Sequence, residues 1–418
     1  MLYRIIKKHG PAYFFSKLIP GLIGMVAVPL FAQLYGLENY GKIMIFVAMG
    51  NAITVLTCGW LAQSWIRFQI TWSDRSNLGQ AILFALIAVM AICSIILLIM
   101  VVFTQYMLNN IFLYFSTTIL MVLGMVLYYI IHAGLQAQFQ SKDVLRISFL
   151  LSILCFGLPI ISFYLNRGVT GFIFAYGLAY IAAALTGFYL YNKTTDSFES
   201  DSQEITTWFK YGFPLSIWLT FQASIPFLER LFIQNLLGPQ QVGQYTALTE
   251  LITRAFSLII FPITLSIQPV MMKHWNQDKK DLVIQIWKQC ISLLSVFMFA
   301  SLCIYLLAHN MIINLISSML NTTFHQPGIL VGLMALSGFL WQANLILHKP
   351  LELSKETGKM VIIILIALAV ISVAYVITVP IYGLVAAAGA ACLGAMTYGL
   401  ITYLYGNIIF RKSHALIQ

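Results

Sequence analysis

Charged residues are scarce in this chain of 418 residues. They make up 9% of the sequence, and only 13 residues are acidic. A soluble domain carries about 25% charged residues, so a water-exposed globular surface and a charge-rich disordered chain are both excluded. Apolar residues make up 60%, and the mean hydropathy is +0.89. A surface of this composition is stable only in lipid, so the sequence predicts an integral membrane protein.

The sequence also lacks the common signatures of covalent, metal and nucleotide chemistry. All six cysteines lie in apolar runs without a C-x-x-C pair, which excludes a disulfide framework and a zinc site. There is no HExxH or G-x-S-x-G motif. The segment Gly36–Ile43 falls one residue short of a P-loop, because Ile43 stands where Mg²⁺ needs a Ser or Thr. We instead expect a glycine-terminated helix followed by a tight turn there, and no metal or cofactor in the chain.

Long apolar runs dominate what remains. A helix needs about 20 apolar residues to cross a bilayer, and lipid admits only helices or closed barrels. None of the runs shows the alternating pattern of a barrel strand. The segment 309–325 is predicted as an interfacial helix or a loop. Twelve runs predict spanning helices: 12–34, 43–66, 79–103, 111–137, 146–165, 170–191, 211–236, 243–270, 284–307, 326–348, 360–379 and 382–408.

The basic residues predict the orientation in the membrane. With a cytoplasmic N-terminus, eighteen of the 23 Lys and Arg residues lie on the cytoplasmic side, and only Lys42 and Arg167 lie opposite. This asymmetry places both termini in the cytoplasm. The net charge of +10 then faces anionic membrane lipids and indicates no nucleic-acid partner. The first run is too long for a signal peptide and is expected to be retained.

The chain reads as two copies of one unit. Lys8 and Gly10 precede the first span, and Lys210 and Gly212 precede the seventh, 202 positions later. We predict a lobe over 1–192, a cytoplasmic linker over 193–209 and a second lobe over 210–418. Six helices in each half give both lobes the same orientation, around a central cavity. The predicted fold is therefore all-α and integral to the membrane, with about twelve transmembrane helices in two parallel-oriented six-helix lobes.

Short motifs resemble those of a known transporter family. They are Gly36-x-x-x-Tyr40-Gly41 after the first span, Arg67-Phe68 after the second, and Gln136-x-Gln138-x-Gln140 after the fourth. In these and in span count the chain resembles the Wzx-type O-antigen flippases of the polysaccharide transporter family. Their superfamily also holds multidrug exporters. The resemblance implies a polyprenyl-diphosphate-linked oligosaccharide as substrate, the bacterial cytoplasmic (inner) membrane as location, and the glycan polymerase and chain-length machinery as partners.

Charges inside the predicted spans are the candidate site. Arg254 lies near the middle of the eighth span, where a charge is costly unless it faces protein or water. Glu250 is one turn earlier on the same face. Two interpretations follow from this spacing: the pair holds helices together, or Arg254 lines a hydrated cavity and Glu250 orients it.

Four further residues complete the candidate substrate-binding set. Lys17 either lines the cavity or extends its amine to the interface. Glu229 and Arg230 are adjacent, so they point about 100° apart and pair poorly with each other. Both are expected to serve as structural partners between the two lobes, or else to line the cavity. His132 either binds a sugar, relays a proton or is simply hydrogen-bonded.

These residues predict a flippase working by alternating access. Fixed cations in a low-dielectric cavity would bind the substrate diphosphate. A cation-coupled multidrug exporter is the first alternative, but the intramembrane carboxylates Glu229 and Glu250 each have an arginine close by. A membrane enzyme of glycan assembly is the second. The predicted outer loops, in which Glu38 is the only acidic residue, weaken that alternative.

Overall fold

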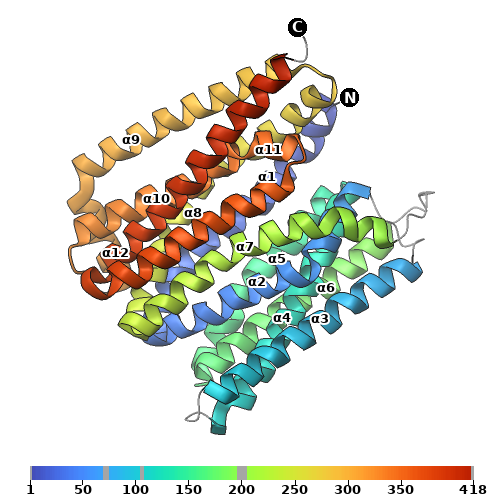
Figure 1. The fold of residues 1–418 in the computed structure, drawn as a ribbon. Coiled ribbons are helices and arrows are strands. Elements are labelled where there is room, and N and C mark those ends of the chain that lie inside the picture. The colour runs from blue at the N-terminus through green and yellow to red at the C-terminus, as the bar shows by residue number, and fades with distance from the viewer. Residues whose placement is uncertain (1, 69–74, 104–107, 195–204, 416–418) are drawn as a thin grey trace. The chain divides into compact units, whose positions relative to one another are not determined.

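The computed structural model describes residues 2–68, 75–103, 108–194 and 205–415. Over these residues the chain is α-helical with short connections (Figure 1). It divides into two compact units. Unit 1 consists of Met1–Ala27 and Leu34–Phe227, and unit 2 of Val28–Gln33 and Leu228–Gln418.

The first half of the chain forms six long helices, as the apolar runs predict. Their bounds are α1 Leu2–Tyr35, α2 Leu37–Phe68, α3 Arg75–Phe103, α4 Leu108–Ala137, α5 Ser141–Tyr164 and α6 Gly168–Thr194.

The second half also supplies six spans, from five long helices. The last helix, α12, holds two of them, because its backbone leaves helical geometry at Gly383. The bounds are α7 Ile205–Leu237, α8 Pro239–Asn276, α9 Lys280–Leu320, α10 Pro327–Leu347, the short α11 Lys349–Leu353 and α12 Thr357–Ala415. Twelve membrane-length segments are thus present among the described residues, and the all-α membrane fold is confirmed.

Two predicted connections differ from the structure. The segment 309–325 is mostly neither an interfacial helix nor a loop, because α9 continues without a break to Leu320 and ends at Asn321 in left-handed conformation. The predicted linker 193–209 is shorter than expected. Lys193 and Thr194 still belong to α6, and α7 begins at Ile205. The remaining linker positions, 195–204, lie outside the described residues.

Gly36 and Gly238 occupy equivalent positions of the sequence repeat, and both have a positive φ. Gly36 separates α1 from α2 with φ +76°, and Gly238 separates α7 from α8 with φ +93°. A Cβ at either position would meet no neighbour within 4 Å. Glycine is therefore favoured by the left-handed backbone and not by crowding. The glycine-terminated helix expected after the first span is confirmed.

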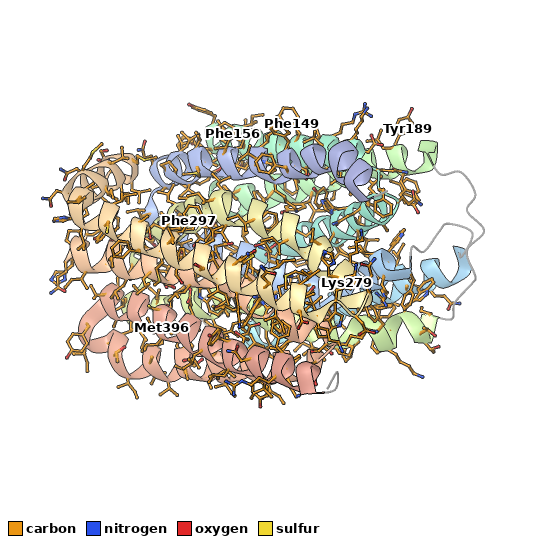
Figure 2. The ribbon with its side chains drawn as sticks, turned by 90° about the horizontal axis from the view of Figure 1, so that it is seen from above. Phe149, Phe156, Tyr189, Lys279, Phe297 and Met396 are labelled. Carbon is orange, nitrogen blue, oxygen red and sulfur yellow. The ribbon has the colours of Figure 1, made fainter. Side chains whose placement is uncertain are left out.

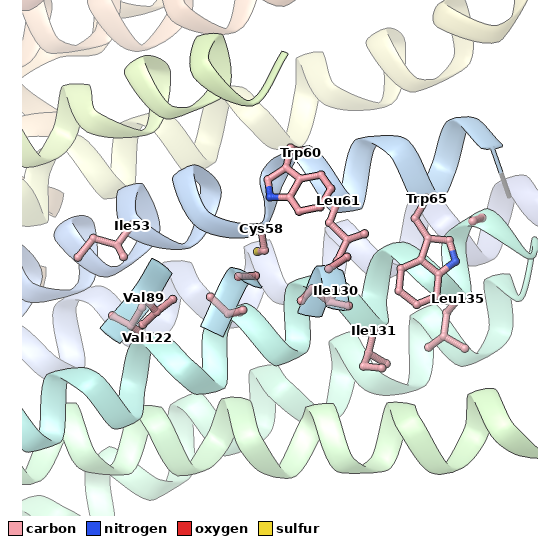
Figure 3. Packing of buried hydrophobic residues seen from close by; sticks show 14 of the residues in the cluster. Ile53, Cys58, Trp60, Leu61, Trp65, Val89, Val122, Ile130, Ile131 and Leu135 are labelled. Carbon is pink, nitrogen blue, oxygen red and sulfur yellow. The ribbon is translucent and has the colours of Figure 1, made fainter. Parts of the chain in front are cut away.

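The helices of unit 1 pack around a continuous apolar core. Trp65 and Leu61 of α2 are fully buried and lie with Ile130 and Leu135 of α4 (Figure 3). Apolar side chains also lie on the outside of the helices. One of them is Phe149 on α5, which is 45% exposed and is labelled in Figure 2. An apolar exterior around an apolar core is the pattern expected of a protein whose solvent is lipid.

Hydropathy distinguishes α7 and α8 from most of the other long helices. Among the described residues, eight helices are long and apolar enough to cross a membrane, and the two arms of α12 count there as one. Neither α7 nor α8 belongs to this set. These two helices carry Glu229, Arg230, Glu250 and Arg254, whereas Lys17 lies on α1, which does belong to it.

Candidate functional site: an ion-pair cluster in unit 2

Three of the predicted site residues meet in unit 2. The Arg230 guanidinium of α7 donates from Nη2 to Oε1 of Glu250 on α8, at 2.9 Å. The other carboxylate oxygen, Oε2, pairs with Nη2 of Arg254 at 3.1 Å, one turn further along α8. Glu250 therefore bridges two arginines with its two oxygens. The three groups together carry one net positive charge.

Burial differs sharply across this cluster. The side chain of Arg230 is 7% exposed, that of Glu250 24%, and that of Arg254 33%. Removing a charge from water costs several kcal/mol per ion, so Arg230 depends on its pairing with Glu250. Arg254 keeps a third of its surface accessible while it is paired. The ion pair between Glu250 and Arg254 that the spacing predicts is present. A role for Arg254 in lining a hydrated cavity stays a prediction.

Glu229 has a further polar partner. It is buried, with 6% of its surface exposed. The Tyr245 hydroxyl hydrogen-bonds to it. The Tyr375 hydroxyl donates in turn to Tyr245 at 3.1 Å. The sequence predicts partners between the lobes for Glu229 and Arg230, whereas their partners Tyr245 and Glu250 both lie inside unit 2.

Tyr245 and Tyr375 were not singled out by the sequence. The chain has 21 tyrosines, and most are accounted for by helix packing and membrane interfaces. Tyr375 lies 130 residues from Tyr245 in the sequence. No local spacing connects them, so only the tertiary fold identifies this hydrogen-bonded chain.

The remaining two candidates lie together in unit 1. Lys17 on α1 is exposed, and His132 on α4 is half-buried. The positive charge of Lys17 is close enough to act on His132. The His132 ring also lies 5.6 Å from the ring of Tyr128 on its own helix. Unit 1 therefore has its own basic position, with the Tyr128 ring beside His132.

Among the described residues, no group of three His, Cys, Asp or Glu side chains is arranged to hold a metal ion. The buried ion-pair cluster is dominated by arginine. An arginine side chain offers planar, bidentate donors that match carboxylate and phosphate groups. The chemistry available at Arg254 is thus binding of an anion by charge-assisted hydrogen bonds.

Solved structures with this fold are membrane transporters. A MATE protein in a bent conformation matches with a TM-score of 0.65 and 15% identity, over 99% of this chain and 96% of its own. An outward-facing multidrug resistance MATE transporter of the MOP superfamily matches with a TM-score of 0.65 and 16% identity, over 99% of this chain and 98% of its own. A MOP superfamily transporter from Pyrococcus furiosus, described as having a binding pocket of reverse polarity, matches with a TM-score of 0.64 and 16% identity, over 96% of each chain.

The helical architecture therefore defines a multi-pass membrane protein with the two-lobe MATE transporter fold. The family follows from the sequence itself: the profile of the polysaccharide biosynthesis protein family matches residues 7–275. The chain belongs to that family. No match was found among the curated proteins. Family and fold together support a membrane transporter in polysaccharide biosynthesis.

Proposed function

We propose that the protein is a flippase that moves a polyprenyl-diphosphate-linked oligosaccharide, such as an O-antigen repeat unit, from the inner to the outer leaflet of the bacterial cytoplasmic membrane. The observation that most directly supports this proposal is Arg254, a cation within a membrane helix that is ion-paired yet has 33% of its side chain exposed. A diphosphate is the anion that such a substrate brings to the membrane interior. The family's role in polysaccharide biosynthesis supports the same substrate class.

The proposed mechanism is alternating access. The diphosphate would bind Arg254, with Glu250 fixing the guanidinium. Lys17 remains a candidate substrate-binding cation of unit 1. The prenyl tail would stay in lipid while the sugar headgroup crosses with the moving lobes. Both termini would face the cytoplasm, and no covalent step is required of the chain. The polymerase and chain-length machinery of glycan assembly would receive the product.

Multidrug export is the competing function, because two of the transporters with this fold are described as MATE proteins. Cation export would need an intramembrane carboxylate that can receive a cationic substrate or ion. Both oxygens of Glu250 are engaged by arginines. Glu229 is buried against Tyr245. The charge balance at this cluster favours an anionic substrate.

Deletion of the gene tests the proposal. We expect surface glycan to disappear and lipid-linked oligosaccharide to accumulate on the cytoplasmic leaflet, and expression of the wild-type chain should reverse both. Drug susceptibility should stay unchanged. Normal surface glycan together with increased susceptibility to cationic drugs would replace the flippase by an exporter. Accumulation of an incomplete glycan would instead indicate an assembly enzyme.

A further inference from the structure

Besides the ion-pair cluster, unit 2 contains a pocket of about 1130 Å³. The end of α7, the first turns of α8, the connection before α10, α10 itself and both arms of α12 surround it. Met396 of α12, labelled in Figure 2, is part of its wall. This volume slightly exceeds the usual range of small-molecule sites, about 300–1,000 Å³.

Very small side chains along one wall leave the space that forms this pocket. Ala386, Gly389 and Ala390 lie on the second arm of α12 and face the pocket. A Cβ built on Gly389 would meet nothing nearer than a Leu333 methyl group at 3.9 Å. Gly383, which lies at the break between the two arms, also lines the pocket and has φ +61°. The backbone there follows a course that favours glycine.

The other side of the pocket is rich in neutral hydrogen-bonding groups. Gln241, Gln244 and Gln326 contribute amides, and Thr323 and Thr378 contribute hydroxyls. Gln244 uses one amide N–H on the Thr322 hydroxyl at 3.0 Å, which fastens the connection before α10 to α8. An amide has two donors and an acceptor with two lone pairs, so Gln244 retains capacity for a ligand.

No Asp, Glu, Lys or Arg is among the described residues that line the pocket. A cationic drug would find no carboxylate among these residues, and a phosphate would find no lysine or arginine, although the His325 imidazole does line the pocket. An alkyl or prenyl chain could pack on the many apolar side chains of the lining, but it would leave the amides and hydroxyls without hydrogen-bond partners, which is costly. A neutral polyhydroxyl ligand avoids all three penalties.

A sugar also suits the mixed character of the wall. Its hydroxyls can bond to the amides while its C–H faces pack against Leu330, Leu333 and the ring of Tyr382. Tyr382 is 68% exposed, so its face is available.

The pocket is also at a suitable distance from the ion-pair cluster. Gln244 and Arg254 lie on the same helix, ten residues apart, or about 15 Å at 1.5 Å per residue. A ligand with an anionic group joined to several neutral sugars could therefore reach both at once. Two linked weak contacts of this kind strengthen binding far beyond either one.

We infer that this pocket of unit 2 is a glycan subsite, which binds the neutral sugars of the substrate while Arg254 binds its diphosphate. The inference rests on the proposed function and adds to it. Specificity for the sugar would then depend on Gln241, Gln244 and Thr378, away from the charges that bind every polyprenyl diphosphate alike.

Binding to the purified full chain in nanodiscs tests the inference, with two separate probes. The first is the oligosaccharide released by mild acid from the cells' lipid-linked intermediate and dephosphorylated, titrated by saturation-transfer NMR. The second is farnesyl diphosphate, titrated by calorimetry. Gly389→Leu should fill the pocket. Gly358→Leu is the matched control on the same helix, because Gly358 lies outside the pocket and has open space around it.

We expect Gly389→Leu to weaken oligosaccharide binding by about tenfold through loss of the sugar's contacts, with farnesyl diphosphate unaffected. Gln241→Leu, which leaves the wall in place, should weaken the oligosaccharide alone, and Gly358→Leu should bind both probes as the wild type does. Equal oligosaccharide affinity in Gly389→Leu and wild type, or no binding to wild type, would overturn the inference. So would a selective loss of farnesyl diphosphate, which would assign the pocket to the prenyl tail. Arg254→Ala tests the proposed function separately, because it should affect farnesyl diphosphate and spare the free oligosaccharide.

Discussion

At the scale of single residues, one carboxylate determines how two arginines behave. Glu250 binds Arg230 and Arg254 through different oxygens. It neutralises one charge and leaves one in excess. Because Arg230 is the more deeply buried of the two, Arg254 is where the excess charge is available. The following two predictions separate a binding role of this charge from a purely structural one.

Arg254→Ala should abolish surface glycan while the protein stays inserted at normal levels. A hydrogen bond to a charged group contributes about 1.5–3 kcal/mol, so its loss should reduce export by about tenfold or more. Arg254→Lys keeps the charge without the planar fork and should retain part of the export. Quantitative glycan staining of cells with matched protein levels measures both. Full glycan display by Arg254→Ala would remove this arginine from the site.

Glu250→Gln tests whether the cluster binds an anion or a cation. The amide keeps the shape of the carboxylate but raises the net charge of the cluster by one. If the cluster binds an anion, farnesyl diphosphate should bind the purified variant at least as tightly as the wild type, with a steeper decrease in added salt. A cation exporter would instead lose its carboxylate and its transport. Thermal unfolding in detergent provides the control for stability, because Arg230 loses its ionic partner.

At the scale of helices, the break in α12 is the least ordinary element. Gly383 has φ +61° and ψ −141°, a region almost confined to glycine. The sequence places spans at 360–379 and 382–408, and the structure joins them in one helix with this single break. A Cβ at Gly383 would meet no neighbour within 4 Å, so backbone conformation alone decides the effect of a substitution.

Gly383→Ala should therefore destabilise the purified protein by about 1–3 kcal/mol. The control is Gly358→Ala on the same helix, where space is also open and φ is not positive. Alanine there should be neutral or stabilising, by up to about 1 kcal/mol. Unfolding midpoints in detergent compare the two. Equal unfolding midpoints for the two variants would show that the backbone at position 383 accepts a Cβ without strain.

Helix number and the two glycine turns follow from local patterns, whereas the end of α9 and most side-chain partners do not. The apolar runs and the glycines at 36 and 238 are local signals, so twelve spans and two matching turns could be predicted. The i, i+4 spacing also predicted the Glu250–Arg254 pair. The partnership of Arg230 with Glu250 spans two helices, and that of Tyr375 with Tyr245 spans 130 residues. Such contacts depend on how helices pack, which no sequence period encodes.

At the scale of the whole molecule, the distribution of basic residues predicts topology. Reporter fusions at the N-terminus, within 195–204 and at the C-terminus should all report a cytoplasmic location. Fusions beside Lys42 and Arg167 should report the opposite side, because eighteen of the 23 basic residues are predicted on the cytoplasmic side. An external location for 195–204 would invert the orientation and the direction of transport with it.

The most direct test is translocation by the purified protein in proteoliposomes. The substrate is a short-chain polyprenyl-diphosphate oligosaccharide, and the readout is its accessibility to a glycosidase added outside. The wild type should speed transfer between leaflets, and Arg254→Ala at equal incorporation should lose that acceleration by about tenfold or more. Equal transfer by both proteins, or no transfer above protein-free vesicles, would contradict a diphosphate carrier that depends on this arginine.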